Sequence, residues 1–170
     1  RREDAWFRAW VQTHRPDWVE ALRRRHPRRA DGPPEIYRVV ESPLRSSEGH
    51  RIVWVWSSLK ADQDQLARQG RIEKGILALE TLETRLRGPR ARCRDQAAVA
   101  QAAEAALRAT GTERWLRVTI HEVVEETFRQ ETRGRPGVGT RYRRRQRHRF
   151  HLEWQPCPEA IEYDARTDGM

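Results

Sequence analysis

Eight arginines between Thr132 and Leu152 carry the clearest chemical signal in this sequence. The segment reads TRGRPGVGTRYRRRQRHRFHL and also holds two histidines, but it contains no carboxylate. Elsewhere in the chain, acidic and basic residues are interspersed. A dense guanidinium array without counter-charges repels itself, and a polyanion, most commonly nucleic acid, relieves that repulsion. The alternative is a solvated arginine-rich hairpin with no specific partner.

The arginines are predicted to lie on the return strand of a long β-hairpin. Residues 115–130 alternate as a strand, GRPGVGT supplies a turn, and residues 142–154 form the return strand. Side chains two residues apart on a strand share a face, with a spacing of roughly 7 Å. One face is then formed by Tyr142, Phe150, Leu152 and Trp154. The other face carries Arg141, Arg143, Arg145, Arg147 and Arg149.

We take these five arginines, together with Arg133 and Arg135 of the turn, as the candidate nucleic-acid-binding residues. Glu122 and Glu126 on the partner strand are the residues that could neutralise them across the ladder. The RGRP sequence at 133–136 also matches the core of minor-groove-binding arms. A hairpin turn that uses Gly and Pro explains the same four letters and is the preferred interpretation.

No other pattern in the sequence supports catalysis or metal binding. The carboxylate pairs Glu125/Glu126, Asp62/Asp64 and Asp164/Asp168 sit on opposite strand faces, in a first helical turn and in a polar tail, respectively. His148 and His151 differ in strand parity, and GRPGVGT lacks the Lys-Ser/Thr of a P-loop. We therefore expect no catalytic residue, no metal site and no cofactor in these 170 residues.

Composition is consistent with an anionic partner and a single soluble domain or fragment. The net charge is +9, hydrophobic residues make up 36% and charged residues 35%, and seven tryptophans argue against disorder. Cys93 and Cys157 form neither a CxxC motif nor a disulfide framework. Without an apolar run of about 18 residues or a signal peptide, we expect no membrane association and a reducing bacterial cytoplasm. The chain starts at Arg1 and its only methionine is Met170, so we expect it to be a segment of a longer protein.

The remaining segments predict an α+β fold in which an antiparallel sheet of two β-hairpins packs against a long helix and shorter helices. Helices are expected near 3–13 and 16–25, a hairpin from strands 36–42 and 50–57, a long helix over 59–87 and an alanine-rich helix over 94–109. The organisation is N-terminal helices (1–34), hairpin (35–58), helical pair (59–110), long basic hairpin (114–155) and tail (156–170). The leucines of the long helix either face an intramolecular core or pair with another protomer.

Several stretches resemble an internal part of bacterial insertion-sequence DDE transposases, in which a large insertion interrupts a ribonuclease-H-like core. They are RREDAWF (1–7), the hairpin at 37–58, the helix at 60–86 with Arg68, Ile72 and Glu73, the turn at 133–145, and DGM (168–170). The last resembles the start of the strand that precedes the helix bearing the catalytic Glu.

The resemblance implies a DNA-binding insertion region that acts on transposon ends, in an enzyme that uses divalent metal, Mg²⁺, and that could act as a homodimer. It also implies that both catalytic Asp residues lie before Arg1 and the catalytic Glu after Met170, so no catalytic residue is carried over to this chain. An RNA-binding structural module with a basic β-hairpin is the alternative function.

Overall fold

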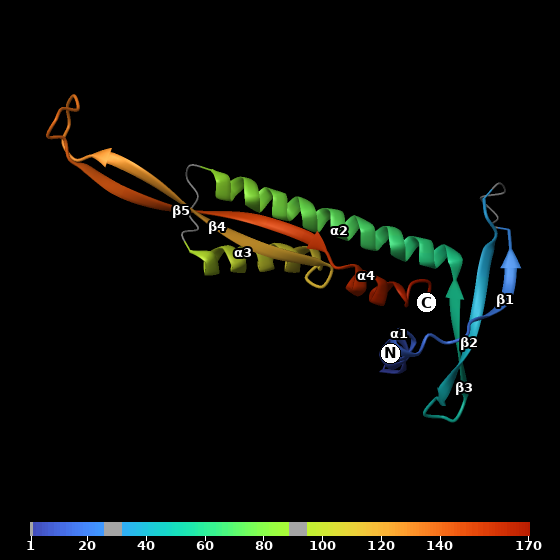
Figure 1. Ribbon diagram of the computed structural model, residues 1–170. Coiled ribbons are helices and arrows are strands. Elements are labelled where there is room, and N and C mark those ends of the chain that lie inside the picture. The colour runs from blue at the N-terminus through green and yellow to red at the C-terminus, as the bar shows by residue number, and fades with distance from the viewer. Residues whose placement is uncertain (1, 26–31, 89–94) are drawn as a thin grey trace. The chain divides into compact units, whose positions relative to one another are not determined.

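The computed structural model describes residues 2–25, 32–88 and 95–170 and has a mixed α+β fold (Figure 1). The chain folds as two compact units. The first comprises Arg1–Arg71 with Cys157–Met170, and the second comprises Ile72–Pro156. From the sequence we expected a single domain or fragment and one sheet. In the described parts of the chain, each predicted hairpin instead belongs to a sheet of its own.

The first unit contains a three-stranded antiparallel sheet with strand order β1-β2-β3. The strands are β1 (Val19–Arg24), β2 (Glu35–Arg45) and β3 (Arg51–Ser57). The predicted hairpin is confirmed by the β2–β3 register, in which Val39 lies opposite Val55. A Ser46–His50 hydrogen bond of 3.0 Å closes its turn.

The predicted helix at 16–25 is wrong, because β1 occupies this segment. Val19 and Leu22 are three residues apart, which is the spacing of a helical face. The register of β1 on β2 shifts between Glu20 and Leu22, so that Val19 lies opposite Val39 and Leu22 opposite Tyr37. This bulge of one residue returns Val19 and Leu22 to the same face of a strand. A helical spacing and a bulged strand therefore produce the same pattern in the sequence.

Helix α1 (Arg2–His14) confirms the first predicted helix and packs on the first sheet through aromatic contacts. Phe7 is completely buried and stacks on Trp54 of β3, with ring centroids 4.1 Å apart and planes within 4°. Trp10 contacts Phe7 at 5.4 Å, and Val11 is also buried. These large apolar contacts supply the core of the first unit.

The chain end at Asp168-Gly169 is held against the start of helix α2 (Ser58–Arg87). It follows the short helix α4 (Pro158–Ala165), and helix and turn together occupy the segment described as a tail in the sequence. Arg68 forms a two-bond pair with Asp168 at 2.7 and 2.5 Å, largely shielded from solvent. Gly169 has a φ of +85°, donates to Asp64 and accepts from the Ser57 N–H at 2.8 Å.

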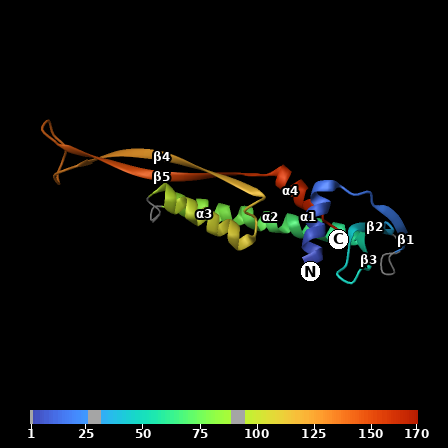
Figure 2. The same cartoon turned by 90° about the horizontal axis from the view of Figure 1, so that it is seen from below.

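The second unit places two helices on one face of a long hairpin, as Figure 2 shows. The hairpin strands are β4 (Leu116–Gln130) and β5 (Tyr142–Pro156), and α3 spans Gln96–Thr110. The predicted alanine-rich helix is confirmed, with an Asp95 side chain that caps it by accepting from the Ala98 N–H at 2.7 Å. The core residues of this unit are Leu79, Leu86, Val99, Ala103, Leu107, Leu116, Phe150 and Leu152.

Helix α2 approaches the α3–β4 connection closely at Gly75. A Cβ atom there would lie 2.6 Å from the Thr112 hydroxyl and 2.9 Å from Leu116 Cδ1. Thr112 is itself completely buried. Gly75 is therefore required by packing, although glycine lowers helix stability in general. Of the helices in the described ranges, none combines the length and the apolar character needed to cross a membrane.

Candidate nucleic-acid interface

We call the β4–β5 hairpin and its connecting loop the arm. The outer part of the arm projects beyond α2 and α3 (Figure 1). Its register is continuous from Leu116 opposite Pro156 to Gln130 opposite Tyr142, without a bulge. The parity inferred from the sequence therefore holds along the whole return strand. Phe150 and Leu152 point into the core, and the odd-numbered arginines lie on the other face. Tyr142 shares the core parity but is exposed, because it lies beyond the packed helices.

The glutamates expected to neutralise the arginine row pair instead with even-numbered residues. Glu126 accepts hydrogen bonds from Arg144 and from the Gln146 amide, and Glu122 pairs with His148. The Arg144 and Gln146 hydrogen bonds lower the pKa of Glu126. Even and odd positions occupy opposite faces, so both carboxylates are directed away from the arginine row.

Arg149, the arginine of the row nearest to the core, makes contacts within the protein. Its Nε lies 3.1 Å from Glu125, and its Nη1 donates to the backbone carbonyl oxygens of Arg87 at 3.1 Å and Gly88 at 3.4 Å. Cations are favourable at helix C-termini, where carbonyl groups lack helical partners. Its side chain is only 20% exposed. Arg149 therefore fastens the arm to α2, and Arg147 lies next to it, opposite Glu125 in the register.

The outer part of the arm carries six exposed arginines whose guanidinium groups make no ion pair or hydrogen bond with any described residue. We call them the distal arginines: Arg129, Arg133, Arg135, Arg141, Arg143 and Arg145. Five of them were predicted. Arg129 was missed because it precedes the basic run on β4, although its register position opposite Arg143 follows from extending the hairpin pairing.

Four distal arginines surround one hollow. Arg129, Arg133, Arg143 and Arg145 line a concavity of about 600 Å³, together with Gln130, Glu131 and Thr132. Glu131 is the single carboxylate among these lining residues. Arginine donors in a fixed fork match the oxygens of phosphate groups. The hollow is therefore suited to an anion that carries several oxygens.

Glu83 of α2 anchors the root of the arm. Its carboxylate accepts from the Leu152 N–H at 2.7 Å and from Arg87 Nε at 2.7 Å, and it lies 3.2 Å from His151 Nδ1. Burial raises the pKa of Glu83, but these hydrogen bonds outweigh burial and bring its pKa below the ordinary value. The carboxylate therefore stays charged at neutral pH and holds β5 in place.

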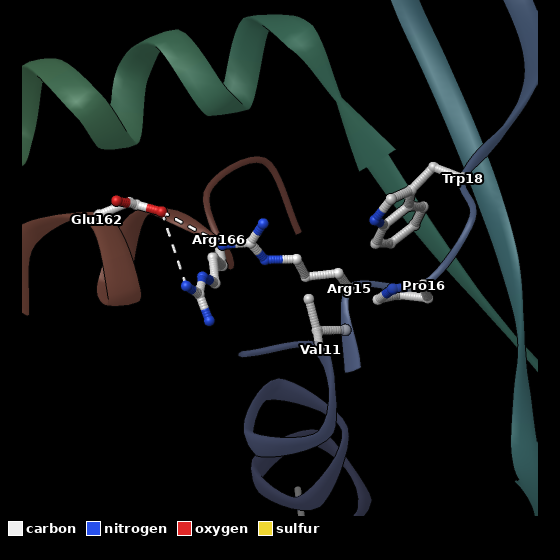
Figure 3. A pocket seen from close by; sticks show the side chains of 6 residues that line it. All are labelled: Val11, Arg15, Pro16, Trp18, Glu162 and Arg166. Atoms are coloured by element: carbon white, nitrogen blue, oxygen red, sulfur yellow. Dashed lines mark hydrogen bonds and ion pairs between the residues drawn. The ribbon is translucent and has the colours of Figure 1, made fainter. Parts of the chain in front are cut away.

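A smaller hollow in the first unit has a different character (Figure 3). It has a volume of about 260 Å³ and is lined by Val11, Arg15, Pro16, Trp18, Glu162 and Arg166. The Arg15 and Arg166 guanidinium groups lie 3.4 and 3.7 Å from the Glu162 carboxylate oxygen, and Arg166 also donates to the Gln12 carbonyl oxygen. The shared carboxylate neutralises part of the positive charge here, so this hollow is a weaker anion site than the arm.

The carboxylate pairs weighed in the sequence do not converge. Asp64 is bound by Lys60 and the Gly169 N–H, while Asp168 is paired with Arg68. Within residues 2–25, 32–88 and 95–170, no three His, Cys, Asp or Glu side chains come together as metal ligands would. The transposase resemblance places the residues that would hold a divalent metal outside this chain, and we propose no chemical step through a metal here.

The comparisons with known proteins leave the geometry as the guide to function: no family model, curated protein or solved structure matches this chain.

Proposed function

We propose that the arm binds the sugar-phosphate backbone of DNA through the distal arginines. The observation that carries the proposal is that these six guanidinium groups are exposed and have no carboxylate partner among the described residues. Like charges held this close repel each other, and phosphate groups relieve the repulsion while releasing condensed counterions.

The arrangement of the distal arginines supports a backbone ligand over a single small anion. Arg143 and Arg145 are two residues apart on one strand face, which separates them by roughly 7 Å. Arg129 lies directly across the ladder from Arg143. The array therefore extends in two directions, which favours a ligand with several phosphates in a row.

We further propose that this chain is the DNA-binding insertion region of an insertion-sequence transposase. Two of the segments that resemble the family, 37–58 and 60–86, correspond to the β2–β3 hairpin and to helix α2, and a third, 133–145, covers part of the tip of the arm and the start of β5. On this proposal the partner is DNA at transposon ends in the bacterial cytoplasm. Mg²⁺ and any homodimer belong to the complete enzyme.

The test is a salt titration of binding to fluorescently labelled duplex DNA. Each phosphate contact contributes about 0.9 to the slope of log affinity against log salt. We expect the double variant Arg143→Ala/Arg145→Ala to reduce that slope by about 1.8 and to weaken binding roughly 30-fold near 0.15 M salt. The matched control, Arg23→Ala/Arg51→Ala, removes two arginines that are paired with Glu20 and Glu41 in the first unit.

A second pair of variants adds charge without removing an arginine. Thr127 lies opposite Arg145, so Thr127→Glu should neutralise the outer row and weaken binding, whereas Thr127→Gln should not. An unaltered slope in the arginine double variant would remove the distal arginines from the interface. Tighter binding to structured RNA than to duplex DNA, measured in competition, would overturn the choice of DNA.

A further inference from the structure

The loop at the tip of the arm, residues 131–141, has a defined internal structure. The Glu131 N–H donates to the Arg141 carbonyl oxygen at 3.0 Å and closes the neck. At the apex, the Thr140 N–H donates to the Gly137 carbonyl oxygen at 3.0 Å, and the Thr140 hydroxyl accepts from the Gly137 N–H at 2.7 Å. The loop is thus held at both ends, and its side chains are presented from a narrow ribbon.

The structure separates the turn from the RGRP segment. The chain reverses at Gly137–Thr140, whereas residues 133–136 precede that turn. A hairpin turn therefore accounts for Gly137 and Gly139, but it does not account for the two arginines. Gly134, between them, has a φ of +138°, a conformation that favours glycine. Its carbonyl oxygen accepts from the Gln130 side chain at 3.2 Å.

The side chains of the loop combine exposed cations with an exposed apolar tip. Arg133 and Arg135 are exposed and have no partner among the described residues. Val138 is fully exposed at the apex, between two glycines. Proteins that enter the minor groove use this combination, in which arginines reach into the groove and an apolar side chain contacts its interior.

We infer that the tip loop binds the minor groove of A·T-rich duplex DNA, with Arg133 and Arg135 inside the groove. This inference rests on the proposed DNA binding and adds a base preference to it. The minor groove is about 6 Å wide, and A·T tracts narrow it and strengthen its negative potential, which attracts arginine. In G·C pairs the guanine amino group occupies the groove floor. The phosphate contacts of Arg129, Arg143 and Arg145 would then hold the arm along the flanking backbone.

The test compares three labelled duplexes of equal length whose central tracts contain A·T, G·C or inosine·C pairs. Inosine·C presents the major-groove edge of G·C but lacks the minor-groove amino group. We expect the wild-type chain to bind the A·T and inosine·C duplexes about tenfold more tightly than the G·C duplex. The variant Arg133→Ala/Arg135→Ala should lose this preference, while Arg143→Ala/Arg145→Ala should weaken binding to all three duplexes equally and keep it.

The outcomes separate this inference from the proposed function. Equal affinity for the three duplexes, with the salt slope intact, would overturn the minor-groove inference and leave backbone binding standing. Inosine·C binding as weak as G·C would also overturn it, because the preference would then come from the major groove. Failure to bind any duplex would overturn the proposed function itself. All four substituted arginines are exposed, so loss of folding is not expected to confuse the result.

Discussion

The substitution Glu83→Gln tests whether one buried carboxylate holds the arm on helix α2. A glutamine retains one carbonyl oxygen for the Leu152 N–H, but it loses the charge and presents an amide to Arg87. Hydrogen bonds to charged groups each contribute about 1.5–3 kcal/mol, and the share of the mostly exposed Arg87 is screened by solvent. We therefore expect the free energy of unfolding to fall by about 2 kcal/mol at pH 7.

The pH dependence of this loss follows from the lowered pKa of Glu83. A carboxyl whose pKa is lower in the folded state stabilises the protein above its unfolded pKa, which for glutamate is about 4.3. That contribution is lost as the pH falls through the folded pKa. The difference in unfolding free energy between wild type and Glu83→Gln should be full at neutral pH and shrink progressively below about pH 4.

Urea denaturation at several pH values measures the difference, and hydrogen exchange of the Leu152 amide reports on the contact itself. Glu80→Gln is the matched control, because Glu80 lies one turn earlier on α2 and is exposed. A difference that is absent at pH 7, or that does not change with pH, refutes the anchoring role. Unchanged exchange at Leu152 in the variant refutes it as well.

Three further predictions concern packing in the two units. Gly75→Ala should destabilise the protein by about 1–2 kcal/mol, because the clash of the added Cβ outweighs the gain in helix propensity. Gly70→Ala on the same helix is the control: its Cβ would meet no neighbouring atom, so it should stabilise the protein by about 0.5–1 kcal/mol. The denaturation midpoints of the two variants test this difference. Arg68→Ala should cost about 3–5 kcal/mol in the same assay, since it leaves the Asp168 carboxylate without its partner. Gly169→Ala should lower the melting temperature, as its Cβ would lie 2.5 Å from a tryptophan ring nitrogen at a positive φ.

Long periodic elements were predicted well from the sequence because their signals are local. Helix α2 starts one residue before the predicted 59, and the Ser57 hydroxyl caps it by accepting from the Lys60 N–H at 3.3 Å. Strand β1 was misassigned because its bulge imitates a helical spacing. The separation of the two hairpins into different sheets depends on contacts between distant segments, for which strand patterning holds no information.

The candidate site, like the fold, was predicted well in its local features and poorly in its tertiary contacts. Strand parity correctly placed Phe150 and the odd-numbered arginines on opposite faces, because the register contains no bulge. Strand parity alone could not show which charged side chains pair with each other. The sequence made Glu126 a neutralising candidate for the row, yet its carboxylate binds Arg144 on the other face. The internal role of Arg149 depends on where α2 ends, which is a tertiary property.

In the arm, the residues that hold the structure together differ from the arginines proposed to bind DNA. A two-stranded hairpin alone is marginally stable in water, and this one receives its support at the root, from Glu83, Arg149 and the packed Phe150. Farther out, the cross-strand pair of Glu126 with Arg144 lies on the even face. The odd face beyond Glu125 can therefore carry arginines that repel one another, because no packed side-chain contact on that face has to be held together against the repulsion. Loss of those arginines should then affect binding without affecting the stability of the core.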